Sequence, residues 1–275
     1  MKILLLGKNG QVGWELQRSL APLGELIALD RHPVSGLSGD LSDLDALRST
    51  IRQINPDVIV NAAAYTAVDK AETDKELADR VNAQATQVMA QETARNGGWF
   101  IHYSTDYVFS GEGLTPWCET ADVSPVNYYG VSKLAGERAV ADSGCKHLIF
   151  RTSWVYGARG NNFAKTMLRL AKDRDALSVI ADQIGAPTGA DLIADVTALA
   201  IQQAVHRPEL SGLYHLAAAG EVSWHGYASH VIEFAKNEGE ELAVKVINPI
   251  DTAAYPTPAR RPLNSRLNTQ KLRDN

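Results

Sequence analysis

Two residues that could move a proton lie one helical turn apart, Tyr129 and Lys133. Side chains four residues apart share one face of a helix, so the phenol and the amine can meet. A free tyrosine has a pKa of about 10 and exchanges protons poorly at pH 7. A neighbouring ammonium favours the phenolate and lowers that pKa, so the pair predicts general acid–base catalysis. Tyr128 lies five residues from Lys133, off the lysine's face.

A polar string, Ser104-Thr105-Asp106, follows an apolar run upstream of this pair. A hydroxyl of Ser104 or Thr105 can hydrogen-bond both a substrate oxygen and the tyrosine. Taken alone, the tyrosine–lysine spacing would also fit an exposed pair on an amphipathic helix. The polar string and a glycine turn near the N-terminus favour the catalytic interpretation.

That glycine turn follows the first apolar run and has glycines at positions 7, 10 and 13. Such glycines allow a tight turn and a close approach of the backbone to a pyrophosphate, which the next helix N-terminus can bind. The alternative is a tight turn without a ligand. We expect a dinucleotide site, with the pyrophosphate held by Gly7, Gly10, Gln11, Val12 and Gly13.

The residues after the second apolar run give conflicting signals about the cofactor. Asp30 can accept hydrogen bonds from the adenine ribose, which suits NAD(H). Arg31 could pair with a 2′-phosphate, which suits NADP(H). Either NADPH or NADH is therefore expected, without a preference. Further candidate contacts are Asp40 and Leu41 at the adenine, although a solvated loop aspartate fits Asp40 equally well, and Ala63, Ala64 and Tyr65 along the middle of the cofactor.

The pattern of elements places these residues on one scaffold. Over the first 150 residues, short apolar runs alternate with helical patterns, which predicts parallel strands with right-handed crossovers. Strands are predicted at 3–6, 26–29, 58–60, 99–103 and 147–151, with helices at 11–20, 43–54, 75–95 and around Tyr129. After about residue 152, helices are predicted at 161–173, 191–205 and 224–236, and strands at 178–180 and 212–215.

The fold class that follows is α/β, a Rossmann-type doubly wound parallel sheet with a smaller C-terminal substrate lobe. We expect the cofactor-binding domain to span residues 1–152 and the substrate lobe 153–275. Within the second part, the segment from about 190 to 216 is expected to return to the first domain.

Composition excludes several other classes of function. The 275 residues carry a net charge of −5 with no long run of one sign, which argues against nucleic acid as a partner. No stretch approaches the ~18 apolar residues of a membrane span, and no signal peptide is expected. The two cysteines, Cys118 and Cys145, lack metal-ligand spacing and indicate free thiols in a reducing cytoplasm.

Taken together, these motifs resemble the extended short-chain dehydrogenase/reductases. The resemblance rests on the glycine turn, Asn61-Ala62-Ala63-Ala64, the string from Ser104 to Phe109, and Tyr129 with Lys133. Further strings at 11–16, 66–72, 151–156 and 182–188 narrow the resemblance to the dTDP-4-dehydrorhamnose reductase family, and the match runs to the Arg-Leu-Asn string at 266–268.

The resemblance implies a reaction and a role for each matching residue. NAD(P)H would deliver hydride to C4 of dTDP-4-dehydro-β-L-rhamnose while Tyr129 protonates the new oxygen, giving dTDP-L-rhamnose. Lys133 would hold the nicotinamide ribose and tune Tyr129, and Thr105 would orient the carbonyl. Trp154 would pack by the sugar, with Ser104 and Asp106 as further substrate contacts. Arg260 and Arg261 are candidates for the diphosphate, although a basic loop fits them nearly as well.

The chain departs from the family pattern in two ways. Family members usually continue past the Arg-Leu-Asn string with another helix, whereas this chain stops at Asn275. Some members use Mg²⁺ at a dimer contact, and Glu15 and Asp191 match two of its acidic positions. Two carboxylates do not make a magnesium cage, so surface acids are the favoured interpretation. A homodimer and a bound Mg²⁺ both stay open.

Related activities differ at identifiable positions. Nucleotide-sugar 4,6-dehydratases follow the threonine with an Asp–Glu pair, whereas here Thr105-Asp106 is followed by Tyr107. The base for elimination is missing, which favours simple reduction. Another nucleotide-sugar epimerase or reductase, or a non-catalytic subunit that senses cofactor, stays open as an alternative.

Overall fold

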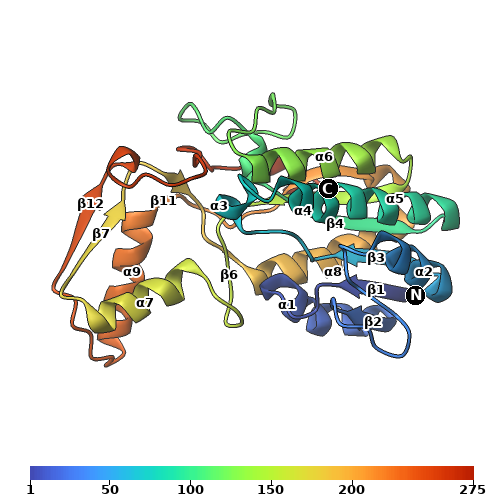
Figure 1. Ribbon diagram of the computed structural model, residues 1–275, viewed down its shortest axis with the longest axis horizontal. Coiled ribbons are helices and arrows are strands. Elements are labelled where there is room, and N and C mark those ends of the chain that lie inside the picture. The colour runs from blue at the N-terminus through green and yellow to red at the C-terminus, as the bar shows by residue number, and fades with distance from the viewer.

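The computed structural model describes residues 1–275, and its main body is built on a six-stranded parallel sheet (Figure 1). The strand order is β10-β5-β4-β3-β1-β2, so the chain reverses direction across the sheet between β1 and β3. Ligands bind at such a reversal in doubly wound folds. The predicted fold class is confirmed. The strands are β1 (Lys2–Leu6), β2 (Glu25–Leu29), β3 (Val58–Asn61), β4 (Trp99–Thr105), β5 (Lys146–Thr152) and β10 (Gly212–His215).

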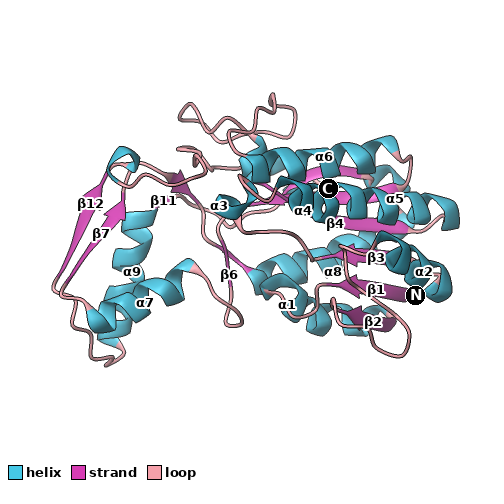
Figure 2. Ribbon diagram, viewed as in Figure 1, coloured by secondary structure: helices cyan, strands magenta, loops and turns pink.

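Helices cover both faces of this sheet (Figure 2). Ile3 and Leu5 of β1 pack in one apolar cluster with Leu16, whereas Leu4 and Leu6 pack in the opposite cluster with Leu47. Because both faces are covered, the strands are apolar on both sides, which explains their continuous apolar runs. The first face carries α1 (Gln11–Leu20) and α8 (Ala190–His206), and the second carries α2 (Leu44–Ile54), α5 (Ala85–Asn96) and α6 (Tyr128–Asp142).

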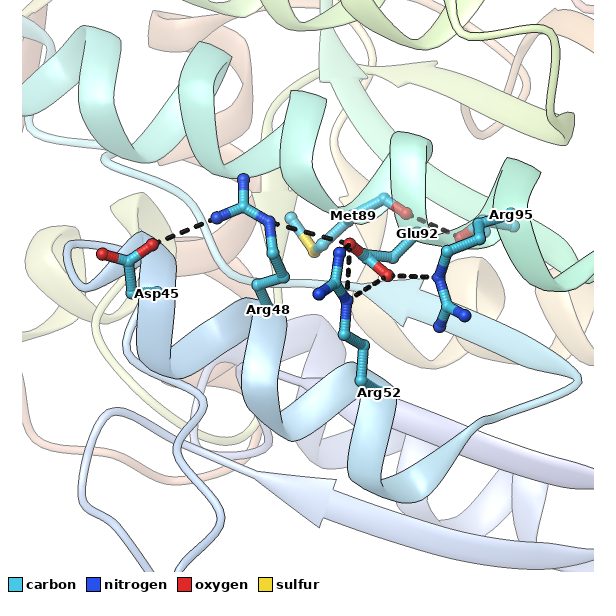
Figure 3. A network of polar contacts seen from close by, with 7 residues as sticks. Asp45, Arg48, Arg52, Met89, Glu92 and Arg95 are labelled. Carbon is cyan, nitrogen blue, oxygen red and sulfur yellow. Dashed lines mark hydrogen bonds and ion pairs between the residues drawn. The ribbon is translucent and has the colours of Figure 1, made fainter.

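A cluster of arginines around one carboxylate joins α2 to α5 (Figure 3). The carboxylate of Glu92 is nearly buried and lies 2.7 Å from the nearest nitrogens of both Arg52 and Arg95. Arg48 approaches the same carboxylate at 3.6 Å and also pairs with Asp45. The cluster fixes α2 to α5, and α5 in turn packs against α6.

The helix predicted at 75–95 contains a change of pitch. It runs as α4 (Lys75–Asp79), a π-helical turn (Arg80–Gln84) and α5. Within that turn, the buried side chain of Asn82 accepts from the Tyr65 amide at 2.9 Å and donates to Ser132 Oγ at 2.9 Å. A π turn displaces side chains from regular helical spacing and is often found at functional sites. Here it lets Asn82 join the loop after β3 to α6.

A second, smaller body lies beside the sheet, at the left of Figure 1. It contains α7 (Phe163–Asp173), α9 (Trp224–Asn237), and β7 (Ala176–Ile180) paired in parallel with β12 (Val246–Ile250). Its small core includes Met167, Leu177 and Ile232. The short strands β6 (Val155–Tyr156), β8 (Ile184–Gly185), β9 (Thr188–Gly189) and β11 (Val222–Ser223) lead into it.

In the sequence, the two parts of the smaller body are separated by a segment that returns to the sheet. Helix α8 packs against α1, and β10 pairs with β5 at the sheet edge. The remaining short elements are α3 (Val68–Ala71), α10 (Gln270–Arg273) and the 3-10 turns at Ala21–Leu23, Asp106–Val108, Pro208–Leu210 and Thr252–Ala254. None of the helices combines the length and apolar character that crossing a membrane requires.

Candidate active site

The tyrosine predicted to donate a proton lies in the first turn of α6. Asn127 caps this helix, because its Oδ1 accepts from the Gly130 amide at 2.9 Å. A Cβ on Gly130 would lie 2.2 Å from the Tyr107 carbonyl oxygen, so glycine permits close packing of α6 on the turn after β4. Across that contact, the Thr105 hydroxyl lies close enough to the Tyr129 phenol to lower its pKa. The structure therefore brings Thr105 and Tyr129 together.

The adjacent tyrosine faces elsewhere. The hydroxyl of Tyr128 donates to Asp79 Oδ2 at 2.5 Å, and Lys75 lies over its ring at 4.8 Å from the centroid. Its side chain is therefore held by α4, off the lysine's face as its position in the sequence predicts. Of the two tyrosines, only Tyr129 has a pKa that Thr105 affects.

The electrostatics of Tyr129 differ from the expectation that Lys133 lowers its pKa. Burial raises the pKa of Tyr129, and the nearby Asp106 carboxylate raises it further, while the Thr105 hydroxyl opposes both. The Lys133 amine donates instead to the Tyr103 carbonyl oxygen at 2.6 Å. Burial also lowers the pKa of Lys133 to about 8, so the ammonium form still dominates at neutral pH. The expected lowering was wrong because burial and Asp106 raise the pKa of Tyr129, and Lys133 is not among the groups that lower it.

Two of the predicted substrate contacts have buried polar atoms without a partner. Asp106 Oδ2 and Ser104 Oγ make no hydrogen bond, although both residues are nearly inaccessible. Burial raises the pKa of Asp106 to about 7, against hydrogen bonds from Ser265 and Thr105. Unpaired buried polar atoms are rare in proteins, and a site that binds a hydroxylated ligand is one explanation for them.

The glycine turn forms a cradle at the N-terminus of α1. Gly7 has a φ of +84°, and a Cβ on Gly13 would lie 2.0 Å from the Gly7 carbonyl oxygen. Gly10 is the N-cap and offers no side chain to the first amides of α1, where Gln11 and Val12 lie. These amides point out of the helix end without an intrahelical partner. The cradle fits the pyrophosphate of a dinucleotide.

At the expected binding site for the adenosine end of the cofactor, the Asp30 carboxylate is surrounded by hydrogen-bond donors. Asp30 accepts from the His32 amide at 2.8 Å and from Asn9 Nδ2 at 2.5 Å. Lys8 lies 3.8 Å away, and the His32 bond is the main reason the pKa of Asp30 is lowered. Arg31 is exposed beside it. Asp30, which suits NAD(H), thus lies next to Lys8, a cation that could pair with the 2′-phosphate of NADP(H). Sequence reasoning missed Lys8.

The other expected cofactor contacts lie on neighbouring turns. Asp40 accepts from the amide and hydroxyl of Ser42, and the side chain of Leu41 is buried in the core, so only its backbone can meet a ligand. The turn with Ala63, Ala64 and Tyr65 follows β3. A Cβ on Gly7 would lie 2.7 Å from the Ala63 amide nitrogen, so the two turns are in contact.

Trp154 lies where the chain leaves β5 for the smaller body. Its φ is +48°, and its ring stacks on Trp224 with centroids 3.5 Å apart. A Cβ on Gly185 would lie 2.7 Å from that ring, so the Gly-Ala-Pro-Thr turn packs on it. Arg261 makes two 2.7 Å hydrogen bonds to Asp69, which leaves Arg260 as the exposed arginine of the pair.

The magnesium residues lie on the packed helices α1 and α8, but they do not complete a site. Glu15 pairs with Arg18 at 3.7 Å, and Asp191 lies in the first turn of α8. No three His, Cys, Asp or Glu side chains gather anywhere in the chain in a way that could hold a metal. The residues present therefore do not fit a magnesium cage.

Besides Lys8, three residues at the site were missed by sequence reasoning. Asn82 and Asn127 brace the catalytic helix through hydrogen bonds, and His102 contacts the Lys133 amine. Asn is a poor helix former, so its presence at 82 inside a predicted helix was an available signal. The presence of His102 within the apolar run at 99–103 was another available signal.

Comparison with known proteins places the whole chain in one family. The model of the RmlD substrate binding domain family matches residues 1–275. The dTDP-4-dehydrorhamnose reductases of Shigella flexneri and Salmonella typhimurium are 58% and 59% identical over 275 residues, which is 100% of this chain and 92% of each relative. A crystal structure of dTDP-4-dehydrorhamnose reductase from Bacillus anthracis in complex with NADP superimposes with a TM-score of 0.87 at 36% identity, covering 99% of this chain and 92% of that one. The chain therefore belongs to the dTDP-4-dehydrorhamnose reductase family.

Proposed function

We propose that the protein is an NAD(P)H-dependent reductase that converts the C4 keto group of dTDP-4-dehydro-β-L-rhamnose to the alcohol of dTDP-L-rhamnose. The observation that carries this is the approach of Thr105 to the phenol of Tyr129, at the sheet edge that also holds the glycine cradle. The choice of substrate is supported by relatives at 58–59% identity that are named dTDP-4-dehydrorhamnose reductase.

The cofactor would lie across the reversal of the sheet. We assign the pyrophosphate to Gly7, Gly10, Gln11, Val12 and Gly13, because the first amides of α1 have no side-chain cap. The adenosine end would meet Asp30, Arg31, Asp40 and Leu41, and the middle would meet Ala63, Ala64 and Tyr65. Lys8 beside Asp30 supports use of NADPH as well as NADH.

The proton donor in this proposal is Tyr129. When bound, the reduced nicotinamide supplies the hydride, and charge then develops on the C4 oxygen of the sugar. The raised pKa of Tyr129 keeps the phenol protonated at neutral pH, so its proton is available for that oxygen. Thr105 would orient the carbonyl, and Lys133 would hold the nicotinamide ribose.

The sugar would bind between the sheet edge and the smaller body. Ser104 Oγ and Asp106 Oδ2, which have no partner in the protein, would take its hydroxyls, and the ring of Trp154 would pack against it. In this division, residues 1–152 with about 190–216 hold the cofactor, and the rest of 153–275 holds the sugar. Glu15 and Asp191 would bind Mg²⁺ only with a further ligand, as in a homodimer. A cytoplasmic location stays a prediction.

The test is a coupled assay in which dTDP-glucose and upstream enzymes supply the keto sugar. With NADPH or NADH deuterated at the transferred position, we expect one deuterium at C4 of dTDP-L-rhamnose, seen by NMR and mass spectrometry. An epimerase would instead purify with tightly bound nucleotide and consume no reduced cofactor. A cofactor-sensing subunit would bind NADPH without turnover, and either result would contradict the proposal.

A further inference from the structure

The loop between β6 and α7 lies against the start of α1 (Figure 1). A Cβ on Gly160 of this loop would lie 3.2 Å from Gln11 Cγ, so the loop contacts the first residue of α1. Gln11 belongs to the glycine cradle, whose amides we assign to the pyrophosphate. The loop therefore brings residues from the C-terminal half of the chain to the edge of the expected nucleotide site.

Asn162 ties this loop to α1. Its Nδ2 donates to Gln11 Oε1 at 3.0 Å and to the Gly157 carbonyl oxygen at 2.8 Å. Its Oδ1 accepts from the Lys165 amide at 3.1 Å, which caps α7. One side chain thus closes the loop, begins α7 and contacts the cradle, so the loop has a defined place beside the nucleotide site.

The loop carries one charged side chain, that of Arg159, and both its backbone and its guanidinium are held. The Lys165 amine donates to the carbonyl oxygens on either side of it, those of Ala158 and Gly160, the second at 2.9 Å. The guanidinium carbon lies 3.8 Å from the centroid of the Trp14 ring in α1. Stacking on an aromatic ring occupies the face of a guanidinium and leaves the N–H groups at its edge free to donate.

The acids near the cradle are paired with other groups. Asp30 lies 3.8 Å from the Lys8 amine, and Glu15 lies 3.7 Å from Arg18. No acid in the chain pairs with Arg159, whose side chain is exposed. A cation without an internal partner therefore lies next to the turn that is expected to meet the phosphates.

A hollow adjoins this guanidinium. Its volume is about 620 Å³, and it is lined by Asn9 of the glycine turn, Trp14 of α1, and Ala158, Arg159 and Gly160 of the loop. That volume is within the range of roughly 300–1,000 Å³ found for ligand sites. A phosphate group in the hollow would lie between the glycine turn and the arginine.

We propose that Arg159 binds a phosphate group of the dinucleotide, with Trp14 holding its guanidinium in place beside the glycine turn. This rests on the function proposed above. An arginine fits the role because its planar fork can donate two parallel hydrogen bonds to phosphate oxygens. The phosphate has two possible sources, the pyrophosphate that NADH and NADPH share and the 2′-phosphate that only NADPH has.

Arg159→Gln tests the contact through NADPH and NADH binding to the full chain, measured by calorimetry. Loss of the charge-assisted hydrogen bonds should raise the Kd of NADPH by about tenfold. An equal rise for NADH would support a contact with the pyrophosphate, and an unchanged Kd of NADH would support a contact with the 2′-phosphate. An unchanged Kd of both nucleotides would overturn the proposal.

Arg174→Gln is the matched control. Arg174 is an exposed arginine at the other end of α7, so its loss changes the net charge equally without altering the loop. We expect the Kd of both nucleotides to stay as in the wild type. A rise equal to that in Arg159→Gln would show an effect of net charge alone and would overturn the contact.

A double-mutant cycle tests whether Trp14 acts through Arg159. Trp14→Leu keeps the charge of Arg159 but removes the ring that holds it, so the Kd of NADPH should rise by about threefold. In the Arg159→Gln background, the same substitution should have no further effect, because the group it positions is gone. Equal effects in both backgrounds would overturn the role assigned to Trp14.

These outcomes also separate the proposal from the one on which it rests. A wild-type chain that neither binds NADPH nor reduces the keto sugar would overturn the proposed function. A wild-type chain that does both, with the Kd of NADPH and of NADH unchanged in Arg159→Gln, would overturn the role of Arg159 alone.

Discussion

Asn127 donates its side-chain amide to the carbonyl oxygen of Arg260 at 2.8 Å, across 133 residues of sequence. The same side chain caps α6 through its oxygen. One residue therefore holds both the start of the helix that carries Tyr129 and the proline-rich tail that passes over it. The position of the proton donor therefore depends on a C-terminal loop that lies 133 residues further along the chain.

The two bonds of Asn127 can be separated by substitution. Asn127→Asp keeps the cap but cannot donate to the tail, whereas Asn127→Ala loses both. We expect Asn127→Ala to lower the free energy of unfolding by about 0.5–2 kcal/mol more than Asn127→Asp, because the cap contributes that amount. Both variants should lose rate, since both release the tail. Denaturant unfolding and kcat measure these effects, and equal stability of the two variants would contradict the assigned cap.

Glycines 10 and 13 are expected to tolerate a methyl group very differently. A Cβ on Gly13 would collide with the Gly7 carbonyl oxygen at 2.0 Å, so Gly13→Ala should cost at least about 1–3 kcal/mol of stability. Gly10 has a φ of −72°, and its Cβ would meet nothing closer than 3.4 Å. Gly10→Ala should therefore keep the melting temperature but weaken NADPH binding, measured by calorimetry. NADPH binding as tight as in the wild type would argue against a pyrophosphate at this turn.

The arginine cluster at Glu92 should make stability depend on pH in the acid range. Hydrogen bonds from Arg52, then Arg95, lower the pKa of Glu92 below its ordinary value of 4.5. Its stabilisation is therefore fully present above that value and is lost as pH falls through the folded-state pKa. Glu92→Gln should be less stable than the wild type by about 1–3 kcal/mol at pH 7. The difference should shrink below about pH 4, and a constant difference in urea unfolding would contradict the account.

Asp106 should make stability depend on pH in the opposite direction to Glu92. Its folded-state pKa of about 7 lies above its ordinary value of 3.8, so the folded protein binds this proton more tightly than the unfolded chain. Stability from this group falls as pH rises from about 4 to 7 and then stays level. Asp106→Asn removes the ionisation, so its stability relative to the wild type should rise across that range. Parallel stability curves from pH 5 to 8 would show that the carboxyl is not buried as described.

Most of the fold could be predicted because continuous apolar strands and amphipathic helices leave a plain pattern. The helix at 11–20 has the predicted bounds, and strands β3 to β5 were found with their polar ends. Strand β12 was missed because it includes Pro249 and exposes much of its surface, so it lacks a continuous apolar run. The π turn at Asn82 was missed because it arises from side-chain bonds to Tyr65 and Ser132, which lie far away in the sequence.

The catalytic group was predicted from spacing, but its electrostatics were not. The four-residue spacing of Tyr129 and Lys133 says nothing about burial, and burial decides the pKa of both groups. Similarly, His102 and Asn61 meet only because β3 and β4 are neighbours in the sheet. Such contacts between strands need the register, which the sequence pattern does not supply.

The most direct test of the account compares Tyr129→Phe with Tyr128→Phe in the reduction of dTDP-4-dehydro-β-L-rhamnose. Removing the Tyr129 hydroxyl should lower kcat by about 10²–10⁴-fold with NADPH binding retained, because general acid catalysis contributes that much. Tyr128→Phe loses only the bond to Asp79 and should keep the wild-type rate. An undiminished kcat in Tyr129→Phe would contradict the assigned proton donor.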